Sequence, residues 1–271
     1  DFYRNNWQKF IEYNIHDVEL VDMLEDKMKL IELAVTMAYD AKVNFEDVFF
    51  QVRMWDSIIY DALTQENIVI PPKTESTKDQ QYAGAYVKEP TPGVYDWVVN
   101  FDLNSLYPHL IMQYNISPET LLDDRVSGIN VDKLLNREID TSTLEGVTIC
   151  PNGTLFTTEK QGFLPKLMEK IYTERTIYKK KMLKAKQEYE NTKDPQLIKD
   201  IAKFNNIQMA RKIQLNSAYG AIGNEYFRYF RLENAEAITL SGQLSIRWIE
   251  NKMNEYLNKI LKSGDKDYVI A

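Results

Sequence analysis

Asp102 is a residue that could do chemistry, and it directly follows an apolar run. The run at 97–101 (WVVNF) predicts a buried strand that leads into the carboxylate. Asn104 or Ser105 is then predicted to cap a short helix that continues to about residue 114. A carboxylate at such a junction can bind a divalent cation, while the first free N–H groups of the helix can bind a phosphate. The plain alternative is an aspartate that only caps the helix.

A second group of chemically useful side chains lies in residues 210–224. There Lys212, Asn216 and Tyr219 are spaced by four and three residues, which places them on one face of a predicted helix. A lysine on this face can bind phosphate, a tyrosine ring can stack on a base, and Gly220 leaves room for another chain to approach. The alternative is a set of solvent-exposed side chains on an amphipathic helix.

Two long helical patterns carry most of the cations and predict an antiparallel pair. They cover about 165–189 and about 195–220, and residues 191–195 join them. On the first of these helices Arg175 and Lys179 are four residues apart and therefore share a face. We expect the cationic faces of both helices to point into one cleft.

The other patterns along the chain complete a mixed α+β fold class. Helical periodicity also covers the first forty residues and about 234–261. The non-helical stretches are a linker or exposed loop at 69–81, two extended segments around a Pro/Gly turn at 82–102, short strands within irregular structure at 123–162, and the start of a buried strand at 268–271.

The charge is distributed unevenly along the chain. The net charge of −7 argues weakly against a nucleic-acid partner, yet residues 163–224 hold 13 Lys and Arg against 6 Asp and Glu. Residues 1–162 hold 13 against 27. A basic block in an acidic chain is typical of a phosphate-binding surface, and a helical hairpin with solvated lysines is the alternative.

Taken together, these patterns resemble the motifs of the family B DNA polymerases. Residues 102–108 (DLNSLYP) resemble the first polymerase motif, D-x-x-S-L-Y-P, and residues 212–220 resemble the second, K-x-x-x-N-S-x-Y-G. Residues 82–85, followed by VKEP, resemble the motif that links the exonuclease and polymerase regions. Residues 115–120 and 223–239 resemble the replicative polymerases of T-even-type bacteriophages.

The resemblance implies template-dependent transfer of a nucleotide from a dNTP to a primer 3′-hydroxyl by two metal ions. It implies that Asp102 and the Leu103 carbonyl bind Mg²⁺, with Mn²⁺ as a substitute. The backbone N–H groups of Ser105, Leu106 and Tyr107 would hold the triphosphate, and the Tyr107 ring would exclude a ribose 2′-hydroxyl. The remaining nucleotide-binding residues that the resemblance implies are Arg175, Lys179, Lys212, Asn216, Tyr219 and Gly220.

The N-terminal part of the chain carries further implied contacts. Tyr13 and Asp17, in YNIHD, resemble the third motif of the family's proofreading 3′–5′ exonuclease, Y-x-x-x-D. By this resemblance Asp17 binds a metal ion and Tyr13 orients the attacking water, while Tyr82 and Gly84 contact the template. A tyrosine and an aspartate on one face of an ordinary surface helix are the alternative.

The resemblance also implies a division into five segments. We expect the end of an exonuclease domain at 1–40, a linker or N-terminal-domain segment at 41–81, the first part of the palm at 82–162, a fingers hairpin at 163–224 and the second part of the palm at 225–271. The palm is expected as an antiparallel sheet with helices, into which the two-helix fingers hairpin is inserted.

Several family motifs are absent from these 271 residues. The Tyr-Gly-Asp-Thr-Asp hairpin and the first two exonuclease motifs are not found, and the chain opens on Asp1, so we expect a fragment that is inactive alone. The expected partners are primer–template DNA, dNTPs and, for the full-length protein, a sliding clamp. No apolar run approaches the roughly 20 residues of a membrane span, and we expect a cytoplasmic protein. A non-catalytic nucleotide- or nucleic-acid-binding module is the alternative.

Overall fold

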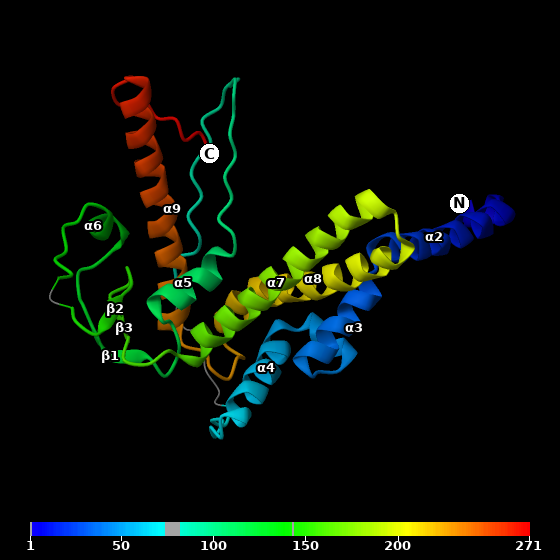
Figure 1. The fold of residues 1–271 in the computed structure, drawn as a ribbon, viewed down its shortest axis with the longest axis horizontal. Helices are drawn as coiled ribbons and strands as arrows, with labels where there is room; N and C mark the ends of the chain where they lie inside the picture. Colours follow the sequence, from blue (N-terminus) through cyan, green and yellow to red (C-terminus); the bar gives the residue numbers. More distant parts are fainter. Residues whose placement is uncertain (1, 74–81, 143) are drawn as a thin grey trace.

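The computed structural model describes residues 2–73, 82–142 and 144–271, and it is mostly helical with one small sheet (Figure 1). The helices are α1 (Phe2–Asn5), α2 (Trp7–Met28), α3 (Leu30–Ala41), the 3-10 helix η1 (Phe45–Phe49), α4 (Gln51–Gln65), α5 (Leu106–Tyr114), α6 (Val131–Leu135), α7 (Phe163–Thr192), α8 (Pro195–Ile222) and α9 (Leu232–Leu261). The strands are β1 (Leu121–Arg125), β2 (Val147–Ile149) and β3 (Thr154–Thr157).

Helices α7 and α8 form a long hairpin, as predicted (Figure 1). The turn between them has clear local causes. Lys193 takes the left-handed conformation, with φ 54°, and its N–H bonds back to Tyr189. The side chain of Asp194 then accepts from the Gln196 N–H, and Pro195 occupies the first helical position, where its missing N–H costs little.

The core lies where α3, α4 and α5 pack against the base of this hairpin. Trp55 of α4, Ile111 of α5, Met168 of α7 and Leu215 of α8 are all fully buried. Burial of each such side chain contributes about 1.5–3 kcal/mol relative to exposure. Helix α4 was not predicted from the sequence, although it supplies the largest side chain in this core.

The three strands form a small antiparallel sheet in the order β1-β3-β2. Phe156 of the central strand faces Leu121 of β1 and Thr148 of β2, and its side chain is completely buried. The prediction of short strands within irregular structure at 123–162 is therefore confirmed, and so is the mixed α+β class.

The predicted buried strand before Asp102 is wrong. No strand is assigned between residues 82 and 105; Trp97 is 98% exposed and Phe101 is 72% exposed. An extended run becomes a strand only when a neighbouring strand pairs with its backbone. Between residues 82–104 and other parts of the described chain, one backbone hydrogen bond is made, from Thr91 N–H to the Ile270 carbonyl, at 2.9 Å.

The predictions at two other short stretches are also corrected. Residues 268–271 are extended and half-buried up to Ile270, but they form no strand in the described structure. Ser105 precedes α5, yet it has φ 52° and its side chain makes no capping bond, so neither it nor Asn104 caps this helix as predicted. Of the linker predicted at 69–81, residues 74–81 lie outside the described residues.

Candidate functional site

Three tyrosines from distant parts of the chain meet at the base of the hairpin. The rings of Tyr107 on α5 and Tyr219 on α8 have centroids 4.8 Å apart, and the hydroxyls of Tyr82 and Tyr219 are 3.0 Å apart. Burial raises the pKa of both Tyr107 and Tyr219, and the hydrogen bond with Tyr82 raises that of Tyr219 further. All three residues were predicted, and two of them belong to the two polymerase-like motifs.

Two glycines allow this close packing, and the sequence patterns did not single them out. A Cβ added to Gly242 of α9 would lie 3.0 Å from Tyr107 Cε1, and one added to Gly223 would lie 2.7 Å from the Tyr82 hydroxyl. A glycine inside a helical pattern often marks a close approach, and that signal was present at Gly242. Larger residues at these positions would displace Tyr107 and Tyr82.

The hairpin also reaches the start of α5 through Arg175. Its Nη1 donates to Ser105 Oγ at 3.1 Å. Its Nε is buried and makes no hydrogen bond to the described residues, which is costly for a guanidinium N–H. The structure thus brings together Ser105 of the first motif and Arg175 of the fingers-like hairpin.

The other nucleotide-binding residues predicted on the hairpin do not join this cluster. Lys179, Lys212 and Asn216 have exposed side chains, and none of them contacts Tyr107 or Ser105 through a described hydrogen bond. Gly220 is exposed as well, and a Cβ there would meet the end of the flexible Gln51 side chain. These four residues lie on the helices where they were predicted, but the described residues do not enclose them in a cleft.

The predicted metal ligands are isolated. Asp102 is exposed, Leu103 is 43% exposed, and the described part of the chain contains no group of three His, Cys, Asp or Glu side chains that could hold a metal ion. A two-metal site needs several carboxylate oxygens. The donor set that the structure describes is therefore insufficient for the implied pair of magnesium ions.

The predicted exonuclease residues lie on a solvated helix. Tyr13 and Asp17 are both on α2, four residues apart and exposed, and no residue of α2 is buried. They share a face, as their spacing predicted. The described structure places no second acidic cluster beside them.

The base of the hairpin is anchored to α3 and α4 by polar contacts. Arg211 of α8 pairs with Asp40 of α3 and with Glu174 of α7, and Trp55 Nε1 donates to Ser217 Oγ at 3.1 Å. These contacts fix the orientation of α8 directly before Lys212 and Tyr219.

The family follows from a comparison with known proteins. Residues 41–268 match the model of DNA polymerase family B, and this range includes both polymerase-like motifs. The chain belongs to DNA polymerase family B. It is 34% identical to the DNA-directed DNA polymerase of Escherichia phage RB69 and 35% identical to that of Enterobacteria phage T4, in each case over 98% of this chain.

The polymerase fold is also found among solved structures. The family B DNA polymerase of the archaeon Pyrobaculum calidifontis aligns with a TM-score of 0.61 and 24% identity over 86% of this chain. The chain is much shorter than the polymerases that it matches. The chain spans 28% of that polymerase and 34% of each phage polymerase.

One further property concerns membranes. Among the described residues of this chain, no helix is both long and apolar enough to cross a bilayer.

Proposed function

We propose that this chain is the nucleotide-binding part of a DNA-directed DNA polymerase. The observation that carries the proposal is the contact between the two motifs, in which Tyr107 packs against Tyr219 at 4.8 Å. The two rings come from two helices and are tilted by 56° to each other, so each offers an aromatic surface on which a base or a sugar ring can pack. The phage relatives, which are named DNA-directed DNA polymerases, support the same activity.

The roles of the individual side chains follow from their positions. The Tyr107 ring would meet the sugar and exclude a ribose 2′-hydroxyl, while Tyr219 and Gly220 would line the base pair. Arg175 donates to Ser105, and its Nε makes no hydrogen bond to the described residues. A bound anion would supply the missing acceptor. The phosphates would then be held by the N–H groups at the start of α5, including that of Leu106, by the hairpin cations Arg175, Lys179 and Lys212, and by the neutral amide of Asn216.

The domain roles belong to this proposal too. The hairpin at 163–224 would be the fingers, and the segments 82–162 and 225–271 would be parts of the palm. Residues 1–40, which include Tyr13 and Asp17, would form the end of a proofreading exonuclease domain. Residues 41–81 would link that domain to the palm. Primer–template DNA would contact Tyr82 and Gly84. The full-length protein would bind a sliding clamp and would act in the host-cell cytoplasm.

The metal ions enter the proposal only in part. Family B polymerases use divalent cations, and Asp102 with the Leu103 carbonyl would supply one carboxylate and one carbonyl oxygen to Mg²⁺. Because the described residues fall short of a two-metal site, no catalytic step is derived from them. The function of the chain's own residues is to bind and orient the nucleotide.

The test is single-nucleotide addition by a polymerase that contains this chain. Arg175→Met should lower kcat/KM for a dNTP by about tenfold or more, because it removes a cation from the phosphates. Lys180→Met is the matched control, since Lys180 lies on the same helix and is exposed. An unchanged kcat/KM in Arg175→Met would contradict the proposed site.

A second candidate is a binding module without catalysis, which the isolated position of Asp102 favours for the 271 residues alone. We expect the purified chain to bind nucleotide but not to extend a primer. Mg²⁺-dependent extension by this chain would exclude the second candidate.

A further inference from the structure

One face of α9 carries a row of polar side chains that contacts an extended segment along its length. This row, the α9 stripe, consists of Thr239, Gln243, Arg247, Glu250, Asn254 and Asn258. The spacings between its members are four, four, three, four and four residues, so all six lie on one side of the helix. The partner segment, residues 83–88, contains no regular secondary structure.

The first half of the α9 stripe holds the segment in chain order. Thr239 Oγ1 donates to the Ala83 carbonyl at 2.9 Å, and Gln243 Nε2 donates to the Gly84 carbonyl at 2.7 Å. The Arg247 guanidinium lies 5.8 Å from the centroid of the Tyr86 ring. Lys88 Nζ then donates to Glu250 Oε1 at 2.7 Å. Each step along the helix therefore has its own partner on the segment.

The lengths of the two partners match. Residues 83 to 88 of an extended chain span about 17 Å at roughly 3.3 Å per residue, and residues 239 to 250 of a helix span about 17 Å at roughly 1.5 Å per residue. The contacts can therefore all form at once, without a bulge or a gap. A shift by one residue would turn the side chains of Tyr86 and Lys88 away from Arg247 and Glu250, because neighbouring side chains in an extended chain point to opposite sides.

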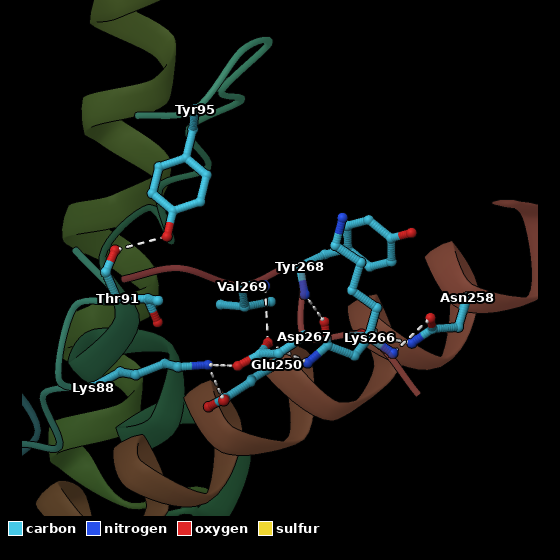
Figure 2. A network of polar contacts seen from close by, with 10 residues as sticks. Lys88, Thr91, Tyr95, Glu250, Asn258, Lys266, Asp267, Tyr268 and Val269 are labelled. Atoms are coloured by element: carbon cyan, nitrogen blue, oxygen red, sulfur yellow. Dashed lines mark hydrogen bonds and ion pairs between the residues drawn. The ribbon is translucent and has the colours of Figure 1, made fainter. Parts of the chain in front are cut away.

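The second half of the α9 stripe holds the end of the chain against the same segment (Figure 2). Lys88 also donates to Asp267 Oδ2 at 2.7 Å, and Asn254 Nδ2 donates to the other oxygen of that carboxylate at 2.8 Å. The Asn258 side-chain amide binds the backbone of Lys266 twice: its Nδ2 donates to the Lys266 carbonyl, and its Oδ1 accepts from the Lys266 N–H. Lys88 is only 16% exposed and is neutralised by two carboxylates, so it fastens the segment to both partners.

We propose that the α9 stripe, with Lys88 as its lock, sets the register of residues 82–88 and thereby places Tyr82 against Tyr219. The inference deepens the proposed function, on which it rests, by assigning positioning residues to the nucleotide site. The hydroxyls of Tyr82 and Tyr219 are 3.0 Å apart. A slip of one residue moves Tyr82 by roughly 3.3 Å, which is enough to break that hydrogen bond.

The register can be measured on the 271-residue chain with two spin labels. Val87→Cys and Tyr256→Cys provide exposed sites on the segment and on α9. The natural Cys150 is buried, and burial raises the pKa of its thiol to about 12, so it stays unlabelled. We expect one narrow distance distribution between the labels in the otherwise unchanged chain.

The variant that tests the α9 stripe is Gln243→Glu combined with Lys88→Met. In Gln243→Glu a carboxylate oxygen replaces the amide group that donates to the Gly84 carbonyl. Lys88→Met removes the contacts to Glu250 and Asp267. The distribution should broaden or shift by about 3 Å, the rise of one extended residue. Ser245→Ala is the matched control, because Ser245 bonds only within α9, to the Ser241 carbonyl. An unchanged narrow distribution in the double variant would overturn the inference.

A second readout separates positioning from folding in a polymerase that contains this chain. Gln243→Glu should lower the rate constant of the first nucleotide addition by about tenfold, with an unchanged burst amplitude. A lower amplitude with an unchanged rate constant would mean that the α9 stripe only stabilises the fold, and would overturn the positioning role. If the unmodified polymerase adds no nucleotide, the proposed function fails, while the spin-label result still decides the register.

Discussion

The base of the α7–α8 hairpin and the segment 82–102 both contain tryptophan and tyrosine, but they place them in opposite environments. Trp55 at the hairpin base is 1% exposed and donates a hydrogen bond to Ser217. Trp97 in the segment is 98% exposed. Buried side chains of several helices pack around the hairpin base, whereas the segment is held along one side of α9 and at Ile270.

The difference explains which predicted site residues come together. Tyr107, Tyr219 and Arg175 lie on packed helices; the two tyrosine rings meet each other, and Arg175 reaches Ser105. Asp102 belongs to the exposed segment, and no described carboxylate cluster includes it. Packed helices fix the positions of their own side chains, while a carboxylate on an exposed run needs further neighbours before it can bind two metal ions.

The largest contrast is expected from removing the two tryptophans. Trp55→Ala should lower the free energy of unfolding by about 3–5 kcal/mol, because it leaves a cavity and removes the hydrogen bond to Ser217. Trp97→Ala should change it by less than about 0.5 kcal/mol. Urea unfolding of the 271-residue chain measures both. Similar losses for the two variants would break the comparison.

The next effect concerns the partly buried ion pairs of the hairpin base. Arg211→Met leaves Asp40 and Glu174 without their cation and should cost about 3 kcal/mol. The matched control is Lys252→Met, which removes an exposed pair with Glu255 on α9 and should cost less than about 0.5 kcal/mol. Equal urea midpoints for these two variants would show that Arg211 does not hold the hairpin in place.

A smaller effect separates stability from function at Gly220. Alanine is the better helix former by about 1 kcal/mol, and the flexible Gln51 side chain can move aside. Gly220→Ala should therefore leave the chain as stable as before or slightly more stable. In a polymerase containing this chain it should lower kcat/KM for dNTPs, if Gly220 lines the base pair. Unchanged kinetics would remove Gly220 from the site.

The smallest effect is a pH dependence of the segment's attachment. Burial alone lowers the pKa of Lys88, but its hydrogen bonds to Asp267 and Glu250 outweigh this and raise it above the ordinary value of 10.5. Hydrogen bonds from Lys88 and Asn254 lower the pKa of Asp267 below 3.8. The contribution to stability should therefore be constant between these two values, and should be lost as pH falls through the lowered pKa or rises through the raised one.

Spin-label distances between positions 87 and 256 measure the attachment. They are recorded from below pH 3.8 to above pH 10.5, so that both transitions are covered. Lys88→Met is the matched control, because without the lysine the acid and alkaline transitions should disappear. A distance distribution that changes near neutral pH would contradict the assignment of these two groups.

Much of the helical framework could be predicted from local sequence. The α7, α8 and α9 patterns are long and periodic, and Pro195 with the turn around it marks a boundary. Helix α4 carried the same kind of signal, because Trp55, Ile59 and Leu63 are spaced by four residues, and it was overlooked. These elements follow from side chains a few residues apart.

The parts that could not be predicted depend on distant partners. The run 97–101 has the composition of a buried strand, but composition does not supply a neighbouring strand. The hydrogen bond between Tyr82 and Tyr219 joins residues 137 positions apart, and the pairing of Lys88 with Asp267 joins residues 179 positions apart. No local pattern encodes such contacts, and the resemblance between motifs predicted the tyrosines but not the α9 stripe.

The central claim is that Tyr107 and Tyr219, from two motifs, line one nucleotide site. The most direct measurement is the ratio of kcat/KM for a deoxynucleotide to that for the matching ribonucleotide, in a polymerase containing this chain. Tyr107→Ala should lower this ratio by about a hundredfold, because it opens the space beside the sugar, while Tyr107→Phe should keep it. An unchanged ratio in Tyr107→Ala would contradict the account.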